Sequence, residues 1–183
     1  MFFTDKCQVY KTRLSEFDDA KASVLGDYLP AKLSMDEGEN VIGMVLPGDY
    51  SGHLLFFFEN GKCARVALSA YATTSNRRKL TGAYSDKSPL TALLHLTEDR
   101  ELALISTEPR ALLLHTSLLT PKSTRSTQGV AVMNIKPRYH LERVCDFADS
   151  GIVNLSRYRV RSIPAAGALL REEDQGREQM TLL

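Results

Sequence analysis

The chain has 183 residues, of which 43% are hydrophobic, and a formal net charge of +1. This length allows one domain with a real core or a few small repeated units, and the overall charge does not by itself indicate a nucleic-acid binder. The charge is unevenly distributed, however. Residues 1–50 contain five basic and nine acidic residues, residues 51–147 contain thirteen and eight, and residues 148–183 contain five of each. The middle of the chain is therefore its basic part.

The cysteine content and the apolar runs exclude several classes of protein. Cys7, Cys63 and Cys145 are an odd number without CxxC spacing, which fits a reducing compartment better than a disulfide framework or a zinc site. No apolar run approaches the roughly 18–20 residues of a membrane helix. The first residues, MFFTDKCQVYKTR, lack the basic start and the long apolar stretch of a signal peptide. We therefore expect a cytoplasmic protein without membrane contact.

The first predicted element is a hairpin over residues 2–17, with two short strands around a polar turn at Asp5-Lys6. A polar connection leads to an alternating segment at 28–33, which predicts a short strand. An acidic turn at 36–39 and an apolar strand at 41–46 complete this unit.

The second and third units repeat this order. FFENGKCARVALSAY (57–71) matches the first hairpin at a spacing of 54, and LISTEPRALLLHTSLL (104–119) follows with Ser117 matching Ser69 at an offset of 48. Predicted strands follow at 89–96 and 102–105 around an acidic turn, and at 129–135. The third unit then continues less regularly at 140–144.

The last part of the chain departs from this pattern. The segment VNLSRYRVRSIP alternates as one more predicted strand, with Arg157, Arg159 and Arg161 on one face. Residues 164–167 are expected to end this strand, and residues 171–183 are expected to form a charged, flexible C-terminal tail.

Units of about 50 residues with four short strands, and no long amphipathic helix, predict an all-β fold of propeller blades or a related radial array. We expect one domain over residues 1–170, with units at about 1–50, 51–101 and 102–147 and a partial unit at 148–170. Three to four four-stranded blades make a partial disc, because three blades do not close a ring.

The repeats resemble the C-terminal domain of the A subunit of bacterial type IIA topoisomerases, DNA gyrase and topoisomerase IV. The similar features are the blade opening FFTDKCQVYKTRL and the arginine-containing loop that runs from Arg125 through Gly129-Val130 to Ile135. The similarity covers roughly residues 1–147. It implies a β-pinwheel, a propeller-like disc whose blades exchange strands and whose basic rim binds and bends duplex DNA.

Two features depart from that family. The full disc has five or six blades, more than this chain supplies. The chain also lacks the glutamine-arginine-arginine-glycine-glycine type of box associated with tight wrapping by gyrase, and TTSNRRKLTG is only a partial echo of it. The resemblance therefore leaves open gyrase or topoisomerase IV, and puts gyrase-like wrapping in doubt.

The candidate DNA-binding residues are positive charges in equivalent connections. Arg77, Arg78 and Lys79 follow the second hairpin, and Lys122 and Arg125 follow the third. Equivalent loops of a radial array project from equivalent edges, so we expect these charges along one rim, where they would contact phosphates without reading sequence. The alternative for each loop is a solvated turn. Further candidates are Lys62, Arg65 and Lys136.

Neutral side chains beside these charges can also donate to phosphate oxygens. They are Ser75, Asn76, Ser123, Thr124, Ser126 and Thr127. The connection of the first unit, Asp18-Asp19-Ala20-Lys21, is acidic, so the first blade is expected to contribute little to the rim.

No catalytic or metal-binding pattern is evident. The tyrosines Tyr10, Tyr71, Tyr84 and Tyr158 lie in predicted strands or loops and fit packing roles, the four histidines have no ligand spacing, and no phosphate-binding glycine loop is present. The chain itself is therefore expected to do no chemistry and to need no cofactor.

The resemblance implies a parent enzyme, an ATP-dependent type II topoisomerase, that uses ATP and Mg²⁺ through other modules. The implied partners are double-stranded DNA, the ATPase B subunit and the catalytic module of the A subunit, in the cytoplasm at the nucleoid. The expected function is sequence-tolerant DNA binding and bending beside the catalytic core. The alternatives are a propeller-like protein interaction module without nucleic-acid binding and an enzymatic propeller, which would need acidic residues converging on a central channel.

Overall fold

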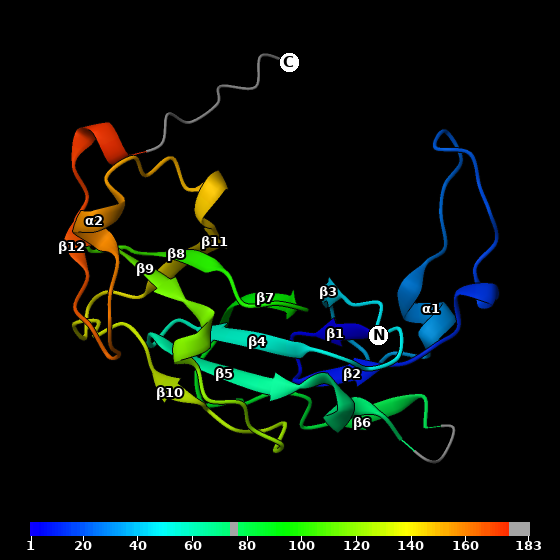
Figure 1. Cartoon of the computed structure of the whole chain (residues 1–183). Coiled ribbons are helices and arrows are strands. Elements are labelled where there is room, and N and C mark those ends of the chain that lie inside the picture. The colour runs from blue at the N-terminus through cyan, green and yellow to red at the C-terminus, as the bar shows by residue number, and fades with distance from the viewer. Residues whose placement is uncertain (74–76, 176–183) are drawn as a thin grey trace.

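The computed structural model describes residues 1–73 and 77–175 and contains three four-stranded antiparallel sheets along an arc (Figure 1). Sheet A has the order β3–β1–β2–β6, with β3 at Val41–Met44, β1 at Phe2–Thr4, β2 at Gln8–Tyr10 and β6 at Lys79–Thr81. Sheet B has the order β10–β5–β4–β7, with β10 at Val130–Ala131, β5 at Lys62–Ala67, β4 at His53–Phe58 and β7 at Leu90–Leu96. Sheet C has the order β11–β8–β9–β12, with β11 at Leu141–Asp146, β8 at Glu101–Ser106, β9 at Arg110–His115 and β12 at Ala168–Leu169. The predicted all-β class and four-stranded units are confirmed.

Each sheet takes its outer strand from the following unit of the sequence. Strand β6 pairs with β2, β10 with β5 and β12 with β9, all antiparallel. The inner strands β3, β7 and β11 return to the hairpin of their own unit. The strand exchange implied by the resemblance is therefore present in all three sheets.

The three hairpins share one design. They are closed by the pairs Phe3↔Val9, Phe57↔Cys63 and Ser106↔Arg110, so the predicted polar turns are at their tips. After each hairpin the chain makes a short 3₁₀ helix, and the three are η1 at Leu14–Glu16, η2 at Leu68–Tyr71 and η3 at Thr116–Leu118.

Strand β4 lies at the centre of the arc, where both faces of its sheet are covered. Leu54, Phe56 and Phe58 belong to the core shared with sheet A. Leu55 and Phe57 belong to the core shared with sheet C. A strand covered on both faces needs apolar residues at every position, which explains the uninterrupted run LLFFF.

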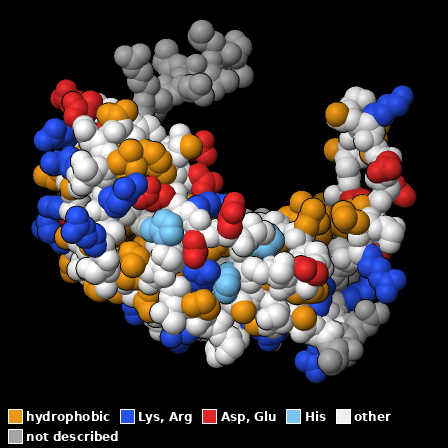
Figure 2. Space-filling model, viewed as in Figure 1, with side chains coloured by type: hydrophobic (Ala, Val, Ile, Leu, Met, Phe, Trp, Pro, Cys, Tyr) orange, Lys and Arg blue, Asp and Glu red, His pale blue; other side chains and the backbone are white. Residues whose placement is uncertain are grey.

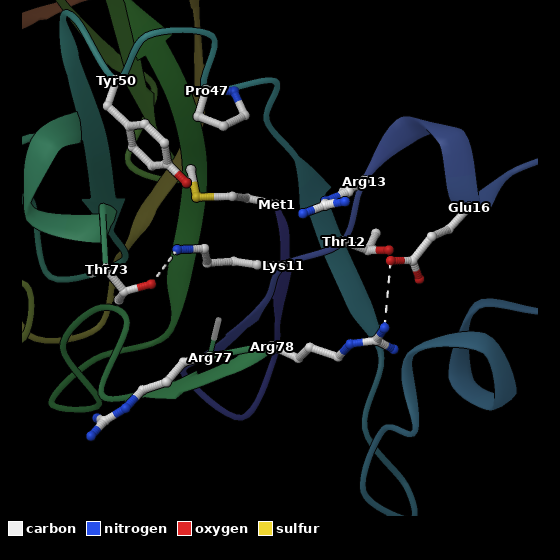
Figure 3. Close-up of a pocket in the computed structure, with 10 residues that line it drawn as sticks. All are labelled: Met1, Lys11, Thr12, Arg13, Glu16, Pro47, Tyr50, Thr73, Arg77 and Arg78. Carbon is white, nitrogen blue, oxygen red and sulfur yellow. Dashed lines mark hydrogen bonds and ion pairs between the residues drawn. The ribbon is translucent and has the colours of Figure 1, made fainter. Parts of the chain in front are cut away.

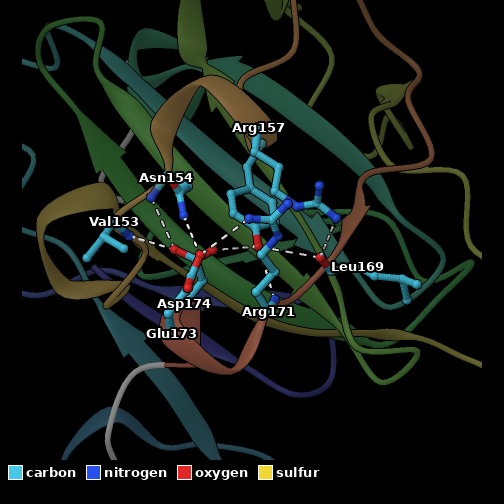
Figure 4. A network of polar contacts seen from close by, with 8 residues as sticks. Val153, Asn154, Arg157, Leu169, Arg171, Glu173 and Asp174 are labelled. Atoms are coloured by element: carbon cyan, nitrogen blue, oxygen red, sulfur yellow. Dashed lines mark hydrogen bonds and ion pairs between the residues drawn. The ribbon is translucent and has the colours of Figure 1, made fainter.

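The outer face of sheet C is covered by the end of the described chain. The covering elements are η4 at Phe147–Asp149, α2 at Leu155–Tyr158 and η5 at Glu172–Asp174. Asp174 is buried and accepts hydrogen bonds from the N–H groups of Val153 and Asn154 and from the Tyr158 hydroxyl (Figure 4). Residues 171–175 of the expected flexible tail are thus part of the fold, and residues 176–183 lie outside the described residues.

Three predicted strands need correction. Residues 28–33 form helix α1 at Leu29–Leu33, with Pro30 in the first turn, where its missing N–H costs nothing. The predicted strand at 153–164 contains helix α2 and places Arg159 against Glu101, so the three arginines do not share a strand face. Only Val130–Ala131 of the predicted strand 129–135 pairs as a strand, next to β5.

Residues 18–28 form an exposed arm at the place where the other units donate an outer strand (Figure 1). All eleven residues are exposed, and Leu25 is 96% accessible. No helix in the described part of the chain is long and apolar enough to cross a membrane.

Candidate nucleic-acid interface

The outer strands β6, β10 and β12 follow the convex side of the arc, whereas β3, β7 and β11 face its concave side (Figure 1). The connections that lead into β6 and β10 therefore emerge on the same side. A shallow hollow lined by Ala70, Thr81, Gly82 and residues 123–126 brings the third-unit connection next to the end of β6. The third-unit connection therefore contacts Ala70 and Thr81-Gly82, which flank the second-unit connection.

In the second-unit connection, Arg77 and Arg78 are exposed and Lys79 is half-buried. The Arg78 side chain is 74% accessible and lies 3.5 Å from the Glu16 carboxylate, a long contact for an ion pair. Lys79 is held more firmly, because its ammonium donates to Asp36 at 2.6 Å and lies over the Tyr10 ring. This hydrogen bond raises the pKa of Lys79 and lowers that of Asp36.

In the third-unit connection, Lys122 is exposed, and its backbone pairs with β5 through the Arg65 carbonyl and the Ala67 N–H. Arg125 is half-buried, donates to the Ala70 carbonyl at 3.3 Å and lies over the Tyr71 ring. Lys122 is therefore available to a ligand, whereas Arg125 also fixes the connection to η2.

Gly129 allows this connection to approach β5 closely. Its φ is +71°, and a Cβ at this position would lie 1.9 Å from the Cys63 carbonyl oxygen. The neighbouring candidates Ser123, Thr124 and Ser126 line the shallow hollow beside β6. Ser75 and Asn76 lie outside the described residues.

The further candidates are engaged with protein groups. Lys62 donates to Gln128, and Lys136 pairs with Glu108. The Arg65 side chain is only 11% accessible and donates to the Asp99 carboxylate at 2.8 Å and to a carbonyl of η3 at 3.0 Å. Arg65 joins sheet B to the start of sheet C and is not presented at the convex edge.

Sequence reasoning missed the contribution of the first unit. Lys11 and Arg13 lie with Arg77 and Arg78 around a hollow of about 410 Å³ (Figure 3). The triplet Lys11-Thr12-Arg13 directly after β2 could have indicated this contribution. The acidic connection at 18–21 led instead to the expectation that the first unit adds little positive charge. Figure 2 shows Lys and Arg side chains along the lower margin of the arc and acidic side chains mainly toward its concave side.

The tyrosines have structural roles. Tyr10, Tyr71, Tyr84 and Tyr158 are all buried, which confirms their predicted packing role. Burial raises the pKa of Tyr71 and of Tyr84, so neither phenol is activated as a nucleophile. In the described ranges, no group of three or more His, Cys, Asp or Glu side chains is placed to hold a metal ion.

Three curled sheets that exchange outer strands define a β-pinwheel, an open relative of the propeller. Solved structures with this fold include the C-terminal domain of DNA topoisomerase IV (TM-score 0.68, 22% identity, 82% of this chain and 47% of that one). The E. coli ParC C-terminal domain matches at a TM-score of 0.67 and 15% identity over 95% of this chain and 77% of that one. A DNA gyrase A C-terminal domain matches at 0.61 and 14% over 94% and 61%. The chain has the fold of the C-terminal domains of type IIA topoisomerase A subunits.

A sequence relative agrees with this fold. The DNA gyrase A protein of Mycoplasma pneumoniae is 24% identical over 136 residues, which are 74% of this chain. The chain spans only 16% of the length of that relative. No protein-family model matches the chain.

Proposed function

We propose that this chain is a DNA-binding and DNA-bending module of a type IIA topoisomerase A subunit, either DNA gyrase or topoisomerase IV. Duplex DNA would follow the convex edge, with Arg77, Arg78 and Lys122 neutralising phosphates and releasing counterions. Such contacts position DNA without reading its sequence.

The observation that carries this proposal is that the third-unit basic connection packs against Ala70 and Thr81-Gly82, on either side of the second-unit basic connection. Three of their five basic side chains, those of Arg77, Arg78 and Lys122, are exposed. Charges on a curved edge favour bent DNA, because a straight duplex could not contact the charges along the whole edge. Bending a site of 20–30 base pairs by 40–90° costs on the order of 1–6 kcal/mol, so several phosphate contacts are needed to offset it.

The remaining partners follow from the parent enzyme that this proposal implies. The catalytic module of the A subunit would receive the bent segment, and the ATPase B subunit would supply ATP and Mg²⁺ chemistry outside this chain. The setting would be the cytoplasm, at the nucleoid. The module itself would hold DNA and do no chemistry.

The test is a fluorescence-anisotropy titration of a labelled 30-base-pair duplex between about 50 and 200 mM salt. The wild-type chain should bind at low salt and lose affinity steeply. Combined Arg77→Glu, Arg78→Glu and Lys122→Glu should abolish most binding. Arg125 is left unchanged because it also fixes η2. Energy transfer between the ends of the duplex reports the bend.

The matched control reverses three basic residues away from the two connections and changes the net charge equally. Lys21, Arg138 and Arg171, all exposed, serve this purpose. Equal losses of duplex affinity in both triple variants would show that the effect depends on net charge alone. That result would refute the convex edge as the binding site. No binding at 50 mM salt would refute the function itself.

The exposed arm favours a second candidate, a protein interaction module. Val24, Leu25 and Tyr28 are large apolar side chains that the described residues leave in solvent. The same titration separates the two candidates, because an interaction module would show no duplex binding.

A further inference from the structure

A cationic hollow lies at the joint between the first and second units (Figure 3). It is lined by Lys11, Arg13, Arg77 and Arg78 and, among the described residues, by the acidic Glu16. Figure 3 shows Arg77 extending away from the other three, so Lys11, Arg13 and Arg78 form its basic wall.

Lys11 is held in a fixed position at the base of this wall. Its ammonium donates to the Tyr71 carbonyl at 3.0 Å and to the Thr73 hydroxyl at 2.8 Å, and it lies over the Tyr50 ring. An ammonium has three donors, so one remains for a ligand after these two bonds. A charge that is already positioned loses little conformational entropy when a ligand binds.

The backbones of Lys11 and Arg78 are neighbours across the strands. The Lys11 N–H donates to the Arg78 carbonyl at 2.6 Å, which continues the β2–β6 ladder. Figure 3 shows their side chains extending in opposite directions, Lys11 toward Thr73 and Arg78 toward Glu16. Glu16, the one acid among the described residues that line the hollow, lies 3.5 Å from Arg78. The hollow therefore has an excess of positive charge that an anion would neutralise.

A polar group in the same wall also lacks a partner. The Thr12 hydroxyl lines the hollow, is buried, and makes no hydrogen bond to any described residue. Buried hydroxyl groups are normally paired, so this one indicates a position that a ligand or water completes. Movement of the Glu16 carboxylate away from Arg78 would open the way to it.

We propose that this hollow binds one phosphate group, with Lys11 as the fixed contact and Arg13 and Arg78 as adjustable ones. If the proposed function holds, the phosphate belongs to the DNA backbone. The acidic first unit would then anchor one end of the DNA path. A free phosphate or nucleotide is the other source of the same chemistry.

The test uses Arg13→Gln, because Arg13 is an exposed residue of the hollow that the proposed function does not use and whose loss spares the bonds that hold Lys11. The control is Arg138→Gln, which removes equal charge from an exposed position outside the hollow. Loss of one phosphate contact should lower the slope of log K against log salt for duplex binding by about 0.9, and the control should keep it. A second titration with inorganic phosphate, followed by amide NMR, should shift the Lys11 and Thr12 resonances in the control and not in the Arg13 variant.

The outcomes separate this site from the proposed function. If duplex binds with an unchanged slope in the Arg13 variant, the site is refuted and the DNA-binding function stands. If no duplex binds but inorganic phosphate shifts these resonances, the site stands for a free anion and the function is refuted. If neither ligand has an effect, both are refuted.

Discussion

The strongest structural prediction concerns Asp174, in a segment whose composition reads as a tail. Asp174→Ala removes three hydrogen-bond contacts to a carboxylate that is 1% accessible. Two of them come from N–H groups just before α2 and share one carboxylate oxygen, and a hydrogen bond of this kind contributes about 0.5–1.5 kcal/mol. The third leaves the buried Tyr158 hydroxyl without its acceptor, at about 1–3 kcal/mol. The expected loss of unfolding free energy is therefore about 2–4 kcal/mol.

Urea denaturation at pH 7, followed by circular dichroism, measures this loss. Asp174→Asn is the matched control, because it keeps one carbonyl oxygen for the two N–H groups and should lose less. A loss below about 0.5 kcal/mol in Asp174→Ala would show that residues 171–175 do not cover sheet C, and would refute this assignment.

The pH dependence gives a second readout of the same network. Burial opposes ionisation of Asp174, but the hydrogen bonds from Tyr158, Val153 and Asn154 outweigh it and lower its pKa. A lowered pKa in the folded state means that the carboxylate stabilises the fold above its unfolded pKa of about 3.9, and that this stability is lost as the pH falls through the folded pKa. The difference between wild type and Asp174→Ala should be constant from pH 5 to 8 and shrink below about pH 4.

Three further substitutions test single contacts by the same denaturation assay. Tyr84→Phe should cost about 1–2 kcal/mol, because it removes the hydroxyl that donates to the Thr4 carbonyl, whereas an unchanged midpoint would contradict that bond. Arg65→Gln should cost about 1–2 kcal/mol by removing the bonds of Arg65 to the partly exposed Asp99 carboxylate and to the Thr116 carbonyl, with unchanged affinity of the folded fraction for duplex DNA. Leu25→Ser should change stability by less than about 0.5 kcal/mol, since a larger loss would mean that the arm packs against the sheets.

The hairpins could be predicted because their information is local. In each, a polar turn lies between apolar strands, and the register follows from the turn. The repeat at 48–54 residues then identified equivalent positions, such as Ser69 in η2 and Ser117 in η3. Local pattern and repetition were sufficient for the class of the fold.

Which sheet a donated strand joins could not be predicted from the sequence. Val24-Leu25-Gly26-Asp27-Tyr28 is similar to Leu80-Thr81-Gly82-Ala83-Tyr84, yet Leu80 and Tyr84 are buried and Val24 and Tyr28 are exposed. The difference is that residues 80–84 have sheet A beside them, whereas no sheet in the described residues offers an edge to the arm. Burial here depends on a distant partner, which composition does not encode.

Individual basic residues were equally hard to assign. Arg65 and Lys122 are basic residues whose backbones are hydrogen-bonded to each other. The Arg65 side chain nevertheless pairs with Asp99, whereas Lys122 is exposed. Side chains alternate between the two faces of a strand, and which face is buried depends on the neighbouring sheet. Sequence could therefore locate the charged segments but not the side chains that reach the surface.

Strand exchange explains why the basic connections lie at the joints between sheets. A segment that leaves one sheet and joins the outer edge of the preceding sheet must cross the joint between them on the convex side. Any basic residue in such a segment is placed at a joint, and the repeat length sets the spacing between joints. The same crossing brings Arg78 beside Lys11 of the previous unit. A basic loop in one unit therefore lies beside the unit before it, which is why Lys11 and Arg13 of the acidic first unit line one hollow with Arg77 and Arg78.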